Sequence, residues 1–330
     1  MTEIEIIDKI GKEFMDTIYK HIPREWISSN GSSGPSFHAQ LSEQNLAYQN
    51  SEYFYEGQRR FVHWTSVQNL MSIINNRELR LYNLQKSSDE KEFKYAADLL
   101  MLQDDRIDHS KNYLYTLSFC EIGEKDNEKL WTEYGKDYSG VAIEFEIEND
   151  PKNWKNFMLS RCYYKVPQKF VNLFNDLKRL RKKWNGIETN IDLGRLIAFH
   201  KHPDFQDELE IRLSSYFPYD NIEAYWKNCN TEFIFDNQRP RITVYFGLKL
   251  WVDNESPYVK SRNPHYDRRL GVEKGYYDKH PKIKIQNIVF GENCGISNME
   301  YSRFRQKLEE VFKLKFGYKI DLPLNLNKKH

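Results

Sequence analysis

Residues 204–217, DFQDELEIRLSSYF, place two carboxylates and a guanidinium at every second position, as Glu208, Glu210 and Arg212. Paired carboxylates can accept a proton from a reacting group or stabilise a developing positive charge. A neighbouring arginine favours the ionised form of a carboxylate. The same pattern is also typical of a solvated strand surface held by salt bridges, so by itself it leaves both interpretations open.

Alternation with a period of two predicts that these residues lie on a β-strand. Leu209, Ile211 and Leu213 would face a hydrophobic core, and the charged residues would share the opposite face. That face would be either ordinary surface or the floor of a site.

Further polar and aromatic pairs occur in two other segments. The stretch RFVHWTS, residues 60–66, predicts a strand with His63 and Thr65 on one face. The stretch KLWTEYG predicts a short helix with Trp131 and Tyr134 on one face, because they are three residues apart. A lone strand histidine is more often structural, and Trp131 suits a core equally well. Taken together, the segments predict one shared site.

The elements that must position these residues alternate without a regular strand–helix–strand rhythm. Strands are predicted at 112–120, which carries Ser118, at 140–147 and at the segment KIQNIVFG; helices are predicted at 3–20, 166–184 and SNMEYSRFRQKLEEVFKL. This order favours an α+β fold.

Composition narrows the class of protein. Charged residues make up 29% and hydrophobic residues 39% of the 330 residues, and the net charge is +1. This composition is typical of a soluble globular protein, and no global field attracts nucleic acid or a membrane. The start of the chain lacks the apolar region of a secretion signal, and no apolar run is long enough to span a membrane.

The four cysteines are scattered and form no CxxC pair. This pattern argues against a zinc or redox motif, so we expect no metal, and it favours a cytoplasmic location. The Ser/Gly/Pro stretch at 28–36 is predicted to hold no regular element. We therefore expect residues 1–59 to be a helical N-terminal extension with a Ser/Gly-rich loop, 60–325 to be the main domain and 326–330 to be a tail.

Four blocks of the chain resemble a widespread bacterial domain-of-unknown-function family. FVHWTSVQNLMSIINN is similar to an opening HYTS strand and helix, and LSFCEIGEKDNEKLWTEYGKDYSGVAIEF resembles the SFS, MWxxYG and GVxIxF segments. FHKHPDFQDELEIR matches FKHPxFxxExEWR, with Ile211 in place of tryptophan. IQNIVFGENC looks like the closing strand. The resemblance extends over residues 60–325 in the family's order.

That family looks like the ADP-ribosyltransferases, which implies split, mostly antiparallel β-sheets with flanking helices and NAD as the substrate. The resemblance implies Glu210 as the carboxylate that stabilises an oxocarbenium-like ribose. Glu208 would be the base for an acceptor, and Arg212 would hold Glu210 ionised or contact the pyrophosphate.

The remaining residues would bind NAD. His63 and Thr65 would grip a ribose, Tyr134 would stack on the nicotinamide with Trp131 behind it, and Ser118 is a further candidate. There is no Gly-rich dinucleotide loop, so a Rossmann-type cofactor site is not expected.

Three functions follow as alternatives. The first is transfer of ADP-ribose to a protein or nucleic acid, as in a toxin or an anti-phage defence effector with an antitoxin or another defence component as its partner. The second is NAD hydrolysis. The third is a non-catalytic module in which the basic run 178–183 and the aromatic residues of 222–280 bind nucleic acid or a partner.

Overall fold

A computed structural model describes residues 2–83, 90–100, 110, 112–165, 167–185, 187–216, 229–236, 239–253 and 279–323. Its helices are α1 (Glu3–Tyr19), α2 (Val67–Asn76), α3 (Glu90–Leu99), α5 (Glu128–Glu133), α6 (Gln168–Lys183) and α10 (Asn298–Lys315). Its strands are β1 (Ile27–Ser33), β2 (Ser36–Leu41), β3 (Arg60–Thr65), β4 (Glu78–Asn83), β5 (Leu114–Glu121), β6 (Val141–Ile147), β7 (Phe157–Arg161), β8 (Glu188–Asp192), β9 (Ile211–Tyr216), β10 (Cys229–Asp236), β11 (Arg239–Lys249) and β12 (Ile283–Phe290). The expected tail, 326–330, and most of 254–280 lie outside the described residues.

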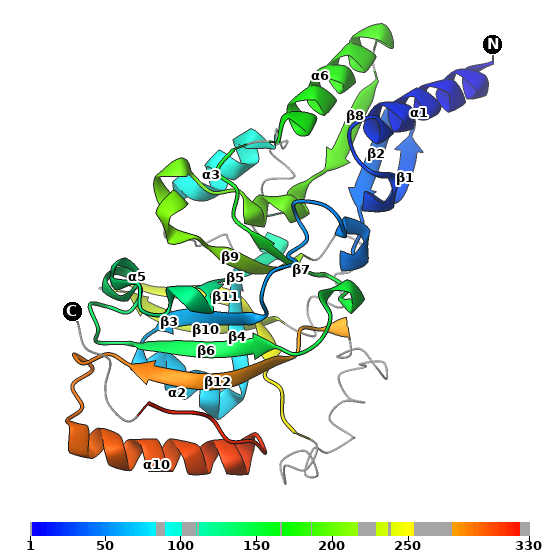
Figure 1. Cartoon of the computed structure of the whole chain (residues 1–330). Helices are drawn as coiled ribbons and strands as arrows, with labels where there is room; N and C mark the ends of the chain where they lie inside the picture. Colours follow the sequence, from blue (N-terminus) through cyan, green and yellow to red (C-terminus); the bar gives the residue numbers. More distant parts are fainter. Residues whose placement is uncertain are drawn as a thin grey trace.

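The main body is built on a large sheet in the order β10-β11-β4-β5-β3-β6-β12, with β9 pairing with β5 and β7 pairing with β9 (Figure 1). The pairings described for this sheet are antiparallel. Together with its flanking helices, this sheet confirms the predicted α+β class, rich in antiparallel strands.

Strand β5 pairs with β4 at Tyr115 and Thr116, and it forms two further ladders at successive positions along its length. It pairs with β3 at Phe61↔Glu121 and Val62↔Cys120, and with β9 from Leu114 to Phe119. Because β3 continues along β6 rather than β5, the sheet divides at this point. The polar residues of β5 and β9 lie beside this division.

One hydrophobic core fills the inner side of the main body. Alternating apolar residues of β5, β6 and β9 meet α2 and α10 there, and they include Phe119, Phe145, Leu213 and Phe312. In Figure 1, α10 lies beneath β12. Burial of these large side chains is the main stabilising contribution, at about 25 cal/mol for each Å² of apolar surface removed from water.

A second lobe contains a three-stranded sheet, β1-β2-β8, next to α1 and α6 (Figure 1). The prediction that residues 28–36 hold no regular element is wrong, because β1 and β2 form a hairpin across this stretch. A hairpin needs only backbone hydrogen bonds, and Gly34 supplies the positive φ of 58° at the turn. The mostly exposed serines of β1 have no core to face, which is why they show no hydrophobic pattern.

The first 59 residues are not separate from the rest of the chain. Strand β2 pairs in parallel with β8 from Ser36↔Glu188 to Gln40↔Asp192. Phe14 of α1 and Phe170 of α6 belong to one core. The structural boundary therefore differs from the expected one at residue 60, because residues 168–199 complete the N-terminal lobe.

In the part of the chain that the structure describes, no helix is both long enough and apolar enough to span a membrane.

Candidate functional site

Four charged side chains form one buried group, which we call the charge cluster: Lys201, Glu208, Glu210 and Arg212. The ammonium of Lys201 bonds to Glu208 and also to Oε2 of Glu210, at 2.7 Å in the second case. Nε of Arg212 donates to Oε1 of Glu210 at 2.6 Å, and Nη2 donates to Oε2 at 3.1 Å. Each of the four residues is only 5% exposed. The predicted carboxylates and arginine are therefore brought together, but as a buried network rather than a solvated face.

The strand ladder explains why Arg212 lies in this group. Arg212 pairs with Ser118 of β5 on one side and with Ser160 of β7 on the other. Its Nη1 donates to the carbonyl of Ala198 at 2.9 Å. The guanidinium is thus anchored against the short helix η6 (Gly194–Phe199), which lies next to β9.

The predicted strand over residues 204–217 is wrong in its first half. Pro203–Glu208 form a short 3-10 helix, η7, and β9 begins only at Ile211. Leu209, expected in the core, has a φ of 48° and is 53% exposed. The proline starts η7, and the left-handed turn at Leu209 reverses the chain, so both neighbouring glutamates are buried while the leucine is not.

Burial alone would raise the pKa of Glu210, but Arg212 and Lys201 outweigh it and hold the pKa at about 2. This direction agrees with the expectation that Arg212 keeps Glu210 ionised. The cluster contains two acids and two bases, so its net charge is zero when all four are ionised.

Tyr134 links the charge cluster to the surface. It follows α5, its side chain is 44% exposed, and its hydroxyl donates to Oε1 of Glu208 at 2.7 Å. Burial and the hydrogen bond to Glu208 raise the pKa of this phenol, so it stays protonated at neutral pH. A partly exposed ring is thus fixed to Glu208, the carboxylate that shares Lys201 with Glu210.

Trp131 has a structural position. It is fully buried, stacks on Tyr138 with centroids 5.0 Å apart, and donates from Nε1 to the carbonyl of Lys125 at 2.8 Å. Lys136, Asp137 and Tyr138 have φ values of 50°, 50° and 63°. For residues other than glycine this conformation costs roughly 1–2 kcal/mol each, so strained backbone flanks the cluster at this loop as well as at Leu209.

His63 and Thr65 do not join the charge cluster directly. Val62 and Trp64 pack with Trp131, so the side chain of His63 leaves β3 on the other face. Its Nδ1 bonds to the carbonyl of Ser118 at 2.8 Å, and burial lowers its pKa.

The hydroxyl of Thr65 accepts from Asn69 at 3.0 Å at the start of α2. Of the predicted polar groups on β3 and β5, Ser118 is the one that is exposed and in register with Arg212. This arrangement differs from the expectation that His63 and Glu210 line one surface.

Lys201 was not among the predicted site residues. A signal existed, because Lys201 belongs to the same FHKHPDFQDELEIR block as the glutamates and Arg212. The segment between them consists of His202 and the 3-10 helix η7, which the alternating pattern of the sequence does not predict. Only the fold of that segment brings the ammonium between the carboxylates.

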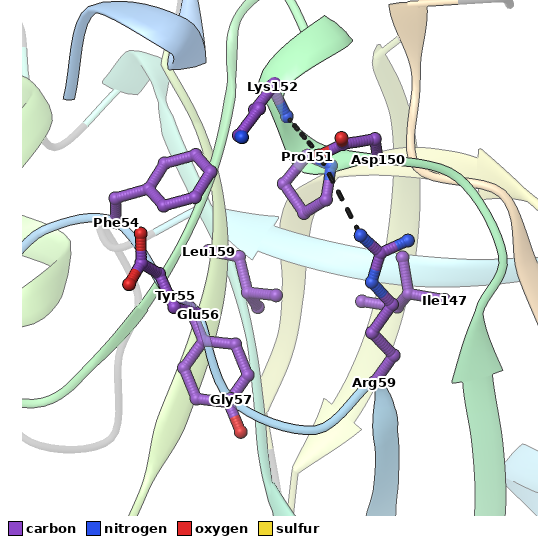
Figure 2. A pocket seen from close by; sticks show the side chains of 10 residues that line it. All are labelled: Phe54, Tyr55, Glu56, Gly57, Arg59, Ile147, Asp150, Pro151, Lys152 and Leu159. Atoms are coloured by element: carbon purple, nitrogen blue, oxygen red, sulfur yellow. Dashed lines mark hydrogen bonds and ion pairs between the residues drawn. The ribbon is translucent and has the colours of Figure 1, made fainter. Parts of the chain in front are cut away.

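Among the described residues, no group of three or more His, Cys, Asp or Glu side chains could hold a metal ion. A cavity of about 240 Å³ lies elsewhere, between the 54–59 segment, β7 and the end of β6 (Figure 2). Phe54, Pro151 and Leu159 supply apolar walls, and Arg59 and Asp150 form an ion pair of 3.8 Å at its rim. None of its lining residues belongs to the charge cluster.

Comparison with known families gives a match over part of the chain. Residues 130–213 are similar to the family described as "Protein of unknown function (DUF2971)". No curated protein and no solved structure matches the chain. The matched segment covers less than half of the chain, yet it contains Tyr134 and all four residues of the charge cluster. The chain is thus similar to this family over the segment that builds the site.

Proposed function

We propose that the protein transfers ADP-ribose from NAD to a macromolecular acceptor and that Glu210 is its central carboxylate. The observation that carries this proposal is the arrangement of Glu210 and Tyr134. The ionised carboxylate of Glu210 shares the ammonium of Lys201 with Glu208, which accepts a hydrogen bond from the half-exposed Tyr134, and strained backbone follows Tyr134 and precedes Glu210. Stored strain of this kind is concentrated at functional sites.

The chemistry assigns a role to each part. When the bond between nicotinamide and ribose breaks, positive charge develops on the ribose carbon. Glu210 would stabilise that charge, Tyr134 would stack on the nicotinamide, and Ser118 or Arg212 would contact ribose or pyrophosphate. Glu208 would accept the proton of the acceptor. Trp131 would anchor in the core the helix that leads to Tyr134, and His63 would fix the backbone at Ser118 through the Ser118 carbonyl.

The division of the sheet at β5 also supports the proposal. The ADP-ribosyltransferase-like fold that the resemblance implies has split, mostly antiparallel sheets, and β5 here pairs with β9 up to Phe119 and with β3 from Cys120 onward. Ser118 lies where β3 leaves β5, one strand away from Arg212. A substrate lying across this division would meet both residues.

Access to Glu210 requires a local movement. Both glutamates are 5% exposed, and the hydroxyl of Tyr134 is bonded to Glu208. We propose that the substrate displaces this hydroxyl and enters beside the turn at Leu209. Closure around the substrate would then exclude water from the charged centre.

The basic run of α6 gives little support to nucleic acid as the acceptor. Arg179 pairs with Asp176 at 2.8 Å, Lys183 with Glu13 at 2.7 Å, and Arg181 donates to Thr189 at 2.8 Å. Three of the five basic side chains between 178 and 183 thus have partners within the lobe, and two of them join α6 to α1 and β8. We therefore propose a protein acceptor.

The deciding experiment incubates the protein with NAD labelled in its adenylate part and a total cell extract. Wild type should release nicotinamide and label macromolecules, and Glu210→Gln should lose at least about 100-fold of both, because the charge-stabilising carboxylate is gone. Glu133→Gln, an exposed carboxylate next to Tyr134, is the matched control and should retain activity.

The other outcomes identify the alternatives. Nicotinamide release without labelled macromolecules indicates NAD hydrolysis. Unchanged NAD with wild-type protein excludes both enzymatic functions and leaves the binding module. If the protein acts as a toxin or defence effector, expression of wild type, but not of Glu210→Gln, should arrest bacterial growth.

A further inference from the structure

The two glutamates of the charge cluster differ in how many cations of the described chain contact them: two contact Glu210 and one contacts Glu208. Glu210 is held by a two-point contact from Arg212 and by Lys201. Glu208 is held by Lys201 and by the neutral hydroxyl of Tyr134. Among the described residues, Lys201 is the one cation within ion-pair distance of Glu208.

Among the described residues, neutral groups also approach the two glutamates. Tyr134 approaches from α5, Cys120 from β5, where its thiol donates to the carbonyl of Glu208 at 3.2 Å, and Tyr164 from the segment after β7. Burial raises the pKa of each of these groups, so none carries charge at neutral pH. Within the described part of the chain, the cations that contact the two glutamates are Lys201 and Arg212.

We infer that Lys201 is a positioning residue that keeps Glu208 ionised and available as the base for the acceptor, whereas Arg212 holds Glu210. Without the ammonium, two buried carboxylates would share one guanidinium, and the cluster would carry a net negative charge. Such a site takes up a proton. The proton goes to Glu208, because Glu210 keeps its two-point contact with Arg212.

This inference rests on the proposed function. In the transfer step, the bond between nicotinamide and the ribose carbon breaks, and its electron pair leaves with the nicotinamide, which becomes neutral. A lone pair of the acceptor forms the new bond to the ribose carbon, and the acceptor's proton passes to Glu208. A protonated Glu208 cannot take that proton, so transfer depends on Lys201 more than nicotinamide release does.

The first test measures ionisation without any activity. Carbon NMR of protein labelled at the glutamate carboxyls, with the Glu208 signal identified by its loss in Glu208→Gln, reports each charge directly. Lys201→Gln should show a protonated Glu208 and an ionised Glu210 at neutral pH, and Lys201→Arg should restore the ionised form. A Glu208 that stays ionised in Lys201→Gln overturns the inference, whether or not the protein acts on NAD.

The second test separates the two steps. Lys201→Gln should lower label transfer by roughly 100-fold, the usual contribution of a general base, and nicotinamide release by less than about 10-fold. Its transfer activity should recover at higher pH, where Glu208 loses the proton. Lys129→Gln removes an exposed lysine that lies 3.6 Å from Asp207, one residue from Glu208, and is the matched control without effect.

If Lys201→Gln does not fold, a double variant that keeps the cluster electrically neutral tests the same inference. Lys201→Gln with Glu208→Gln leaves Arg212 paired with Glu210, so it should fold and release nicotinamide while transferring no label. Equal loss of release and transfer in this variant would contradict the division of roles.

Discussion

Arg212 and Lys201 decide the charge of Glu210, and this effect has a consequence for stability. The folded protein holds the pKa of Glu210 at about 2, against an ordinary value of 4.5. In the unfolded chain, Glu210 takes up a proton as the pH falls through 4.5, whereas in the folded protein it stays ionised until the pH approaches 2. The contribution is therefore complete above 4.5 and is lost between these two values.

The corresponding prediction compares wild type with Glu210→Gln in urea unfolding at several pH values. At neutral pH the difference in free energy of unfolding should include on the order of 3 kcal/mol from this carboxylate. That difference should shrink as the pH falls below 4.5. A difference that stays constant down to acid pH would show that Glu210 is not held ionised by its neighbours.

At the scale of elements, the junction between η7 and β9 explains why the alternating pattern predicted one strand where the structure has a short helix followed by a strand. Glu208, Glu210 and Arg212 alternate with apolar residues, so the sequence reads as one strand. The pattern is correct from Ile211 onward, where Leu213 faces the core. It fails at Leu209, because Pro203 starts a short helix whose end needs a left-handed residue.

A pair of leucine-to-glycine substitutions tests this junction. Leu209→Gly should raise the free energy of unfolding by roughly 1 kcal/mol, because glycine adopts the left-handed conformation without strain and little burial is lost. Leu314→Gly is the control: Leu314 is similarly exposed, at 50%, but lies within α10, where glycine should destabilise by about 1 kcal/mol. Thermal unfolding of both variants shows whether each substitution raises or lowers the stability relative to wild type. A loss of stability in Leu209→Gly would mean that the turn is unstrained.

At the scale of the whole molecule, the chain passes from the N-terminal lobe to the main body and back again. Residues before β3 and residues 168–199 build one core, and β9 contributes Tyr216 to that core while Leu213 enters the other. Since one strand has side chains in both cores, we expect the lobes to unfold together rather than in sequence.

This expectation is tested at α1. Phe14→Ala removes a buried ring from the N-terminal core and should lower the free energy of unfolding by about 3–5 kcal/mol, still in a single transition. Ile4→Ala on the same helix is the control, because Ile4 is 73% exposed. A separate early transition for Phe14→Ala, followed with circular dichroism and tyrosine fluorescence, would indicate that residues 1–59 form an independent extension.

The sequence by itself determined many of the local elements. The strands at β3, β5, β6 and β12 and the helices α2, α5, α6 and α10 follow from apolar periodicity and from caps such as Ser297, which are properties of neighbouring residues. It also identified the glutamates and Arg212 as a group.

Only the tertiary structure decided how that group is arranged. It placed Lys201 between the carboxylates and paired the serine-rich hairpin with β8. The position of Lys201 depends on how the segment between Lys201 and Glu208 folds, and the pairing of the hairpin depends on contacts between residues distant in sequence. Neither feature leaves a periodic pattern in the chain.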